Sequence, residues 1–506
     1  MEARFLTPRG VFWFGFLVLA AANAAYLVSP PYWDGIVGVY SQGVWLARNG
    51  FNLVALISEP TFAEGGAYLN PFLAWAMLFA ALSRTLPPPV AFAVLHVLTV
   101  GLAALTLAAC FALLSGRTGP RLALLWTVAA AANPVFSGQT AGIYLEIPIA
   151  ACFALSLVLF DRGRFTAAAA VCATGWFMKD SMLIAAAAYA TFALVAIALG
   201  RGLGIKAHAP RSPRTLVLAA PLALMLIASV ATSTSTQISD LDLALDLEWL
   251  ARIAWLCFPE QIALTALGLL AASAWLLCGA RPVATETPGH AVQRARDRSM
   301  VLLLSILLGG FWASFLLHEN PLARYTTLVV VPLALLLAII TASRPRFSAS
   351  LGGCMLVFGL VNQTGALLPE LPFYDSRSGH FLERSREYLA DLDANRAMAQ
   401  LLEEHHGDTV IVAKYPFVQM LRLPEIGYVH RTLPNVVAAG WVPRVTEARP
   451  FRGFDSLPPE ALIVFAPNVF EVTWPPSLQP RPVDNIVYAF AGGTQSTVVY
   501  RRDARP

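Results

Sequence analysis

Twelve long apolar runs dominate this chain, and they constrain its fold more than any other feature. They cover residues 11–28, 70–86, 89–115, 120–137, 147–160, 165–178, 181–200, 215–232, 255–280, 299–317, 321–342 and 348–368. Most of them approach the ~20 residues that a helix needs to cross ~30 Å of hydrocarbon. Only 13% of the 506 residues are charged, whereas a soluble protein carries about 25%. The sequence therefore predicts a polytopic all-α membrane protein.

The first apolar run leaves two alternatives open. Arg4 and Arg9 precede it and the sequence Ala-Asn-Ala lies near its end, which is the pattern of a cleaved signal peptide. However, the run is long enough to cross a bilayer and further spans follow it, which favours an uncleaved first helix.

The basic loops predict which runs cross the membrane, because Lys and Arg are retained on the cytoplasmic side. If the N-terminus is cytoplasmic, every basic loop lies on the cytoplasmic side only if one of the early apolar runs does not cross the membrane. The run 70–86 is the best candidate, because it is short, carries Arg84 and ends in three prolines. We therefore predict about 11 transmembrane helices, with juxtamembrane helices in a first outer loop at 30–88. The N-terminus would be cytoplasmic and the C-terminus extracytoplasmic.

The composition changes near Phe373, where charged residues return. The pattern of apolar residues predicts one or two amphipathic helices over residues 383–406. It also predicts strands at residues 409–413, 461–465, 486–490 and 497–500. We expect a transmembrane module at 1–371 and an extracytoplasmic α/β domain at 372–506. The sequence has no glycine-rich phosphate loop, no basic face for nucleic acid and no cysteine pair at zinc-ligand spacing.

The loop after the first span contains a candidate reactive residue. Asp34 lies at the end of a membrane helix, among tyrosines and tryptophans. An acidic residue there is costly unless it is used or solvated. Two interpretations stay open: Asp34 is the reactive carboxylate of a membrane enzyme, or it is a solvated loop residue.

The predicted topology places further ionisable residues on the same side of the membrane as Asp34. Taken alone, each has a structural explanation: an interfacial anchor for the cations, a carboxylate at a helix N-terminus, or a solvated histidine. Together they predict one cavity, with cations for a phosphate and a carboxylate for a proton. These residues are Glu146, Lys179, His318, Arg324 and Tyr325.

The order of these motifs resembles a known family between about residues 11 and 340. Asp34 is followed by Tyr40 and Ala47, and later come the segments YLNPFLAWAMLFAAL, YLEIPIAACFALSLVLF, GWFMKD and HENPLARYTTLVVVPLALLLA. The pattern is similar to the GT-C fold glycosyltransferases of the family 39 type, which use lipid-phosphate-linked sugars. These include protein O-mannosyltransferases and the aminoarabinose transferase of lipid A. The chain departs from the family in having Gly35 after Asp34 and Asn70 before Pro71.

The resemblance implies a bacterial inner-membrane glycosyltransferase of inverting type. By resemblance, the donor would be a sugar linked to a polyprenyl phosphate, namely undecaprenyl phosphate. The acceptor would be a lipid, glycan or protein outside the cytoplasm. Asp34 would be the general base, with Lys179 and Arg324 on the donor phosphate. The sequence leaves open whether a divalent metal ion binds between Asp34 and Glu146, although no spacing of metal ligands indicates one. The substrate-orienting residues would be Glu146, His318, Tyr325 and Tyr68.

Two other functions also fit parts of the sequence. A transporter or flippase of a lipid-linked substrate would place ionisable groups along a path, with repeated helices and broken spans. A non-catalytic membrane scaffold would use its outer domain to bind a protein partner. No internal repeat is visible in the sequence, and the polar residues collect at one predicted face, which favours the enzyme.

Overall fold

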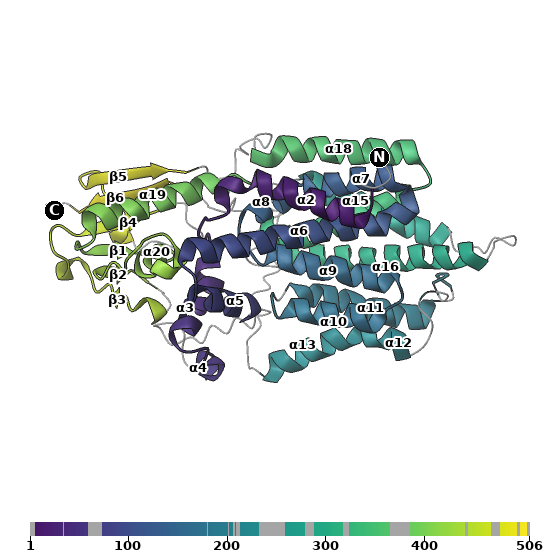
Figure 1. Ribbon diagram of the computed structural model, residues 1–506, viewed down its shortest axis with the longest axis horizontal. Coiled ribbons are helices and arrows are strands. Elements are labelled where there is room, and N and C mark those ends of the chain that lie inside the picture. The colour runs from purple at the N-terminus through teal and green to yellow at the C-terminus, as the bar shows by residue number, and fades with distance from the viewer. Residues whose placement is uncertain are drawn as a thin grey trace. The chain divides into compact units, whose positions relative to one another are not determined.

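The computed structural model describes most of the chain, in two compact units (Figure 1). The described residues are 6–33, 35–58, 73–179, 181–200, 202–205, 208, 213–231, 259–278, 288–316, 323–364, 385–440, 444–466, 476–492 and 496–502. The first unit comprises residues 1–22, 99–140 and 145–368, and the second comprises residues 23–98, 141–144 and 369–506. The predicted boundary between residues 371 and 372 lies outside the described residues.

The first unit is a bundle of long helices that run in roughly the same direction in Figure 1. Eight of the described α-helices begin at a proline. Proline suits the first position of a helix because its missing N–H would have no intrahelical partner there. The helices that lie wholly or mainly in this unit are α2 (Pro8–Ala22), α6 (Pro88–Thr118), α7 (Pro120–Ala131), α8 (Pro134–Ala141), α9 (Glu146–Asp161), α10 (Phe165–Trp176), α11 (Met182–Leu199), α12 (Pro213–Leu216), η3 (Val217–Ala219), α13 (Ala220–Ala231), α15 (Pro259–Cys278), α16 (Pro288–Leu316), η5 (Ala323–Thr326), α17 (Thr327–Thr341), α18 (Pro345–Val361) and η6 (Asn362–Thr364).

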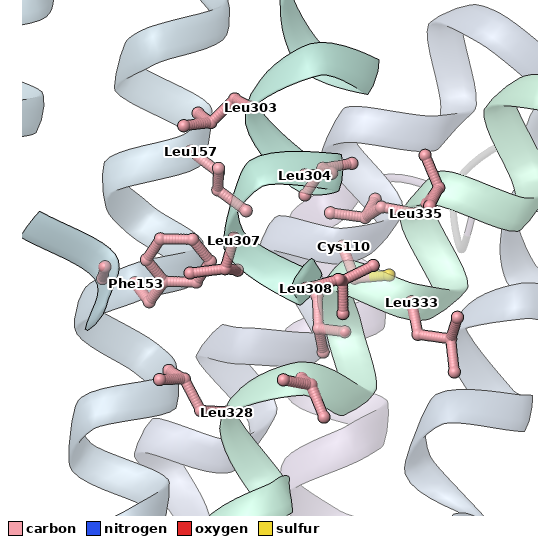
Figure 2. Packing of buried hydrophobic residues seen from close by; sticks show 14 of the residues in the cluster. Cys110, Phe153, Leu157, Leu303, Leu304, Leu307, Leu308, Leu328, Leu333 and Leu335 are labelled. Atoms are coloured by element: carbon pink, nitrogen blue, oxygen red, sulfur yellow. The ribbon is translucent and has the colours of Figure 1, made fainter. Parts of the chain in front are cut away.

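Helix α17 is the centre of this bundle. It is apolar all round, and 14 of its 15 residues are buried, as expected for a helix with neighbours on every side. It packs against α7, α9, α15, α16 and α18. Figure 2 shows leucines of α16 and α17 interlocking with side chains of α9 and α6, among them Phe153 and Cys110.

Among the described residues, fewer helices than the 11 predicted pass a test of length and composition for crossing a membrane. By length and composition, four described helices qualify, or five if α8 and α9 form one bent span. Seven further apolar helices have 10–17 residues. Every predicted span coincides with one of these helices, so the polytopic helical fold is confirmed, while the count of 11 stays a prediction. Helix α5 (Leu73–Ser83), in the run predicted not to cross, has 11 residues, or about 16 Å at 1.5 Å per residue.

The second unit joins the first loop to the C-terminal part of the chain. From the loop come η1 (Ala24–Tyr26), the π-helix η2 (Gly35–Tyr40), α3 (Ser41–Arg48), α4 (Leu53–Ser58) and α5. From the C-terminal part come α19 (Tyr388–His406), α20 (Phe417–Arg422), η8 (Pro424–Ile426), η9 (Arg444–Thr446), η10 (Phe454–Ser456) and η11 (Pro476–Leu478). Helix α20 contacts η2, and α3 contacts both η8 and η9.

A six-stranded mixed sheet forms the core of the C-terminal part. Its order is β3-β2-β1-β4-β6-β5, with parallel pairing from β3 to β4 and antiparallel pairing of β6 with β4 and β5. The four predicted strands are present, whereas β2 and β3 were not predicted. Side chains such as Val412, Ile463 and Tyr500 fill this core. The strands are β1 (Ile411–Ala413), β2 (Val436–Ala438), β3 (Arg449–Pro450), β4 (Leu462–Phe465), β5 (Asn485–Ala491) and β6 (Ser496–Arg501).

Candidate functional site

A buried carboxylate between two cations is the main polar feature of the first unit. Glu146 is the first residue of α9, directly after a break at which α8 and α9 bend by 119°. Its side chain is only 2% exposed. A carboxylate at a helix N-terminus is favoured by the helix dipole, but one so deeply buried also needs a charged partner.

Lys179 is the first such partner. It lies in the short turn between α10 and α11, and its ammonium donates a hydrogen bond to Oε1 of Glu146. The side chain is 13% exposed, which makes it the most accessible of the three charged residues.

Arg324 is the second partner. It belongs to η5, immediately before α17, and its Nε lies 3.2 Å from the same oxygen of Glu146. The aromatic ring of the next residue, Tyr325, completes the cluster. The ring centroid lies 4.3 Å from Nζ of Lys179 and 5.5 Å from Cζ of Arg324, within the ~6 Å range of a cation–π interaction.

The cluster joins residues that are far apart in the sequence. The structure brings together four of the candidate residues from three helix ends: Glu146, Lys179, Arg324 and Tyr325. Taking such charges out of water costs several kcal/mol per ion unless each is paired. Sharing one carboxylate between two cations leaves a positive balance within this group. The arrangement can therefore hold an anionic group, such as a phosphate.

A second ionic cluster lies at the other end of α9. Arg117 at the end of α6 donates hydrogen bonds to Asp161 at the end of α9 and, at 2.7 Å, to Asp297 of α16. Glu146 and Asp161 are the first and last residues of α9, so they are about 22 Å apart along the helix axis. The basic loop residues Arg117 and Arg162 thus lie at the opposite end of the bundle from the Glu146 cluster. This separation agrees with the predicted sorting of loops into two sides.

Three of the predicted site residues lie outside the described residues. These are Asp34, Tyr68 and His318. The metal proposed between Asp34 and Glu146 also depends on Asp34, so it stays a prediction. Of the two neighbours of position 34, Trp33 is only 2% exposed and Gly35 is the first residue of the π-helix η2.

A group of buried, hydrogen-bonded tyrosines in the second unit was not predicted from the sequence. The hydroxyl of Tyr40 donates to the carbonyl oxygen of Ile143 at 2.7 Å and accepts from Nε1 of Trp75 at 3.0 Å. Burial raises the pKa of the Tyr40 phenol, so it stays a neutral hydrogen-bonding group. Tyr144 and Tyr428 make similar bonds to the first loop. These contacts span up to 397 positions of the sequence, and no local pattern announces them.

No protein-family model and no curated protein sequence matches this chain. The chain is similar to the crystal structure of ArnT from Cupriavidus metallidurans in the apo state, with 14% identity and a TM-score of 0.48. The match covers 96% of this chain and 97% of that one.

Proposed function

We propose that this multi-pass membrane protein is a glycosyltransferase of the GT-C type. The observation that carries the proposal is the cluster of Lys179 and Arg324 around Glu146. Buried cations within a helical membrane protein are costly and are usually functional, and two cations sharing one carboxylate suit a phosphate-bearing substrate. A polyprenyl-phosphate sugar has such a phosphate next to the bond that sugar transfer breaks.

In the proposed reaction, an acceptor hydroxyl attacks the anomeric carbon of the donor sugar. Asp34 takes the proton of that hydroxyl as general base, and this role rests on the sequence alone. The bond from the anomeric carbon to the phosphate oxygen breaks, and its electron pair stays on the phosphate. Lys179 and Arg324 stabilise the negative charge on the leaving phosphate. A single displacement of this kind inverts the anomeric configuration.

Glu146 has a supporting role in this scheme. Its carboxylate keeps the two cations adjacent when no phosphate is bound, which limits their reorganisation on binding. We propose that Tyr325, Tyr68 and His318 orient donor or acceptor, and that the C-terminal α/β domain helps to select the acceptor. The location would be the bacterial inner membrane, with the C-terminal domain outside the cytoplasm.

Mass spectrometry of envelope lipids and glycans, with and without the protein, tests the function directly. Loss of one sugar modification would identify donor and acceptor together. For the mechanism, Asp34→Asn should lower kcat by about 10²- to 10⁴-fold, the usual contribution of a general base, while the protein level in the membrane stays unchanged. Full transfer by this variant would show that Asp34 is not the base.

A transporter or flippase remains the second candidate because of one specific feature. The α8–α9 pair is bent by 119° next to Glu146, and broken helices often form the binding sites of transporters. Purified protein in vesicles with a radiolabelled polyprenyl-phosphate sugar separates the two. The transferase releases polyprenyl phosphate as sugar appears on an acceptor, whereas a transporter moves the intact lipid without cleaving it.

A further inference from the structure

The backbone just before position 34 is irregular yet deeply buried. Residues 29–33, here called the 29–33 segment, form no helix or strand, and Tyr32 and Trp33 are each 2% exposed. Pro30 and Pro31 have no N–H groups, so this stretch cannot pair as an ordinary strand. Its buried carbonyl groups nevertheless need hydrogen-bond donors.

Side chains from three distant parts of the chain supply these donors. Nε2 of His96 lies 3.1 Å from the carbonyl oxygen of Ser29. The Tyr428 hydroxyl donates to the carbonyl oxygen of Pro31 at 2.8 Å, and the Tyr144 hydroxyl donates to that of Tyr32 at 3.2 Å. Burial raises the pKa of the Tyr428 phenol well above its usual range, so its hydroxyl remains a donor at any physiological pH.

Aromatic contacts fix the side chains of the same segment. The Tyr32 ring stacks on that of Tyr388, with centroids 5.4 Å apart. Tyr388 also meets the Tyr144 ring edge-on at 6.1 Å. The Trp33 ring lies 6.3 Å from the ring of Tyr415, which follows strand β1. The C-terminal part of the chain therefore holds the 29–33 segment through rings as well as hydroxyls.

The turn that carries Tyr428 is itself anchored to the first loop. Arg48 of α3 makes a bidentate pair with Glu425, at 2.8 and 3.0 Å. Gly427 has φ of +88°, and a Cβ there would come within 2.6 Å of the Phe92 ring. Only glycine allows such a close approach with this backbone conformation, so the position of the Tyr428 hydroxyl is tightly defined.

The segment ends in a strained conformation next to position 34. Trp33 has φ of +48°, a left-handed conformation that is uncommon for a bulky residue and persists only when its surroundings enforce it. Beyond position 34, the amides of Gly35 and Ile36 donate to the carbonyl oxygens of Tyr32 and Trp33 at 3.2 and 2.9 Å. Such strain often accompanies functional positions.

From these contacts we infer that Tyr428 and Tyr144 are positioning residues for the proposed transfer reaction. Their hydroxyls hold the backbone of the 29–33 segment, which directly precedes the proposed base, Asp34, in the chain. This inference rests on the proposed function, since it assigns a reaction to Asp34. A displacement of about 1 Å in a reacting group can lower a rate ~10²-fold, so loss of one anchoring hydroxyl should be visible in kcat.

The test compares Tyr428→Phe with a matched control, Tyr500→Phe. Tyr500 also donates a buried hydrogen bond to a carbonyl, that of Leu478 at 2.7 Å, but it lies in the sheet core. Both variants lose one hydroxyl, so both should lose similar thermal stability. We expect Tyr428→Phe to lower kcat by about 10- to 100-fold with an unchanged KM for the lipid donor, and Tyr500→Phe to change neither. Tyr144→Phe serves as a second test variant.

Amide hydrogen exchange provides a readout that does not depend on activity. Exchange in the peptide from Gly35 to Leu46 should be faster in Tyr428→Phe than in the wild type, and unchanged in Tyr500→Phe. Suppose that the wild type transfers sugar. Equal kcat in Tyr428→Phe and Tyr500→Phe, or equal exchange of this peptide in the two variants, then overturns the positioning role. A wild-type protein that transfers no sugar overturns the proposed function itself and the positioning role with it.

Discussion

Replacing Lys179 with methionine separates the catalytic role of its charge from its structural role. Methionine keeps most of the apolar stem but removes the ammonium. The hydrogen bond to Glu146 is charge-assisted, and such bonds contribute about 1.5–3 kcal/mol. Glu146 keeps its second partner, because Nε of Arg324 remains at 3.2 Å. We therefore expect a stability loss of about 1.5–3 kcal/mol, with the protein still folded and inserted.

The effect on turnover should be larger than this stability loss suggests. Removing one group that stabilises a developing oxyanion typically lowers kcat by about 10²- to 10³-fold. The assay is sugar transfer from a polyprenyl-phosphate donor by purified protein in detergent or vesicles, with kcat normalised to folded protein. Lys414→Met is the matched control, because Lys414 is another partly buried lysine, outside the Glu146 cluster.

The result that would refute this reasoning is simple to recognise. A folded Lys179→Met protein with more than a tenth of wild-type kcat would show that the ammonium does not stabilise the charge that develops on the leaving phosphate. Equal losses in Lys179→Met and Lys414→Met would show that the assay reports general damage. A normal kcat with a raised KM would assign Lys179 to donor binding alone.

Two further predictions concern buried carboxylates. Glu146→Gln leaves two buried cations without their shared carboxylate, so it should lower the free energy of unfolding by about 3–5 kcal/mol. Its Tm should therefore fall further than that of Lys179→Met. A smaller fall in Tm than that of Lys179→Met would contradict the ion-pair geometry. Burial alone would raise the pKa of Glu403, but hydrogen bonds from His430 and Arg431 hold that pKa below its usual value. The ionised carboxylate therefore stabilises the fold above about pH 4.3, and this contribution is lost as pH falls through the lower folded pKa. The difference in Tm between wild type and Glu403→Gln should be largest near pH 7 and smaller in acid. A difference that does not depend on pH would contradict this role of the Glu403 carboxylate.

The sequence predicted the helical bundle and much of the cluster because both depend on local signals. Apolar runs mark the helices, and prolines mark many of their starts. Glu146, Lys179 and Arg324 could be grouped because each lies at a helix end on the same predicted side. Alternation of basic and non-basic loops was sufficient for that inference.

Features that depend on distant contacts could not be predicted in the same way. The strand β2 has three residues, too few for a periodic pattern, and its place in the sheet is set by pairing with β1. The partners of the 29–33 segment lie up to 397 positions away. The bend between α8 and α9 occurs at residues 142–145, a short stretch that predicts a loop equally well. In each case tertiary packing, which a single sequence does not display, decides the structure.

The long separation between Tyr428 and Pro31 also affects how the protein is made. At about 5–20 residues per second, a ribosome needs about 20–80 s to synthesise the 397 residues between them. For most of that time the rings of Tyr32 and Trp33 lack their partners Tyr388 and Tyr415. Premature termination before Tyr388 would leave both rings without these partners permanently, so quality-control proteases should remove such fragments quickly.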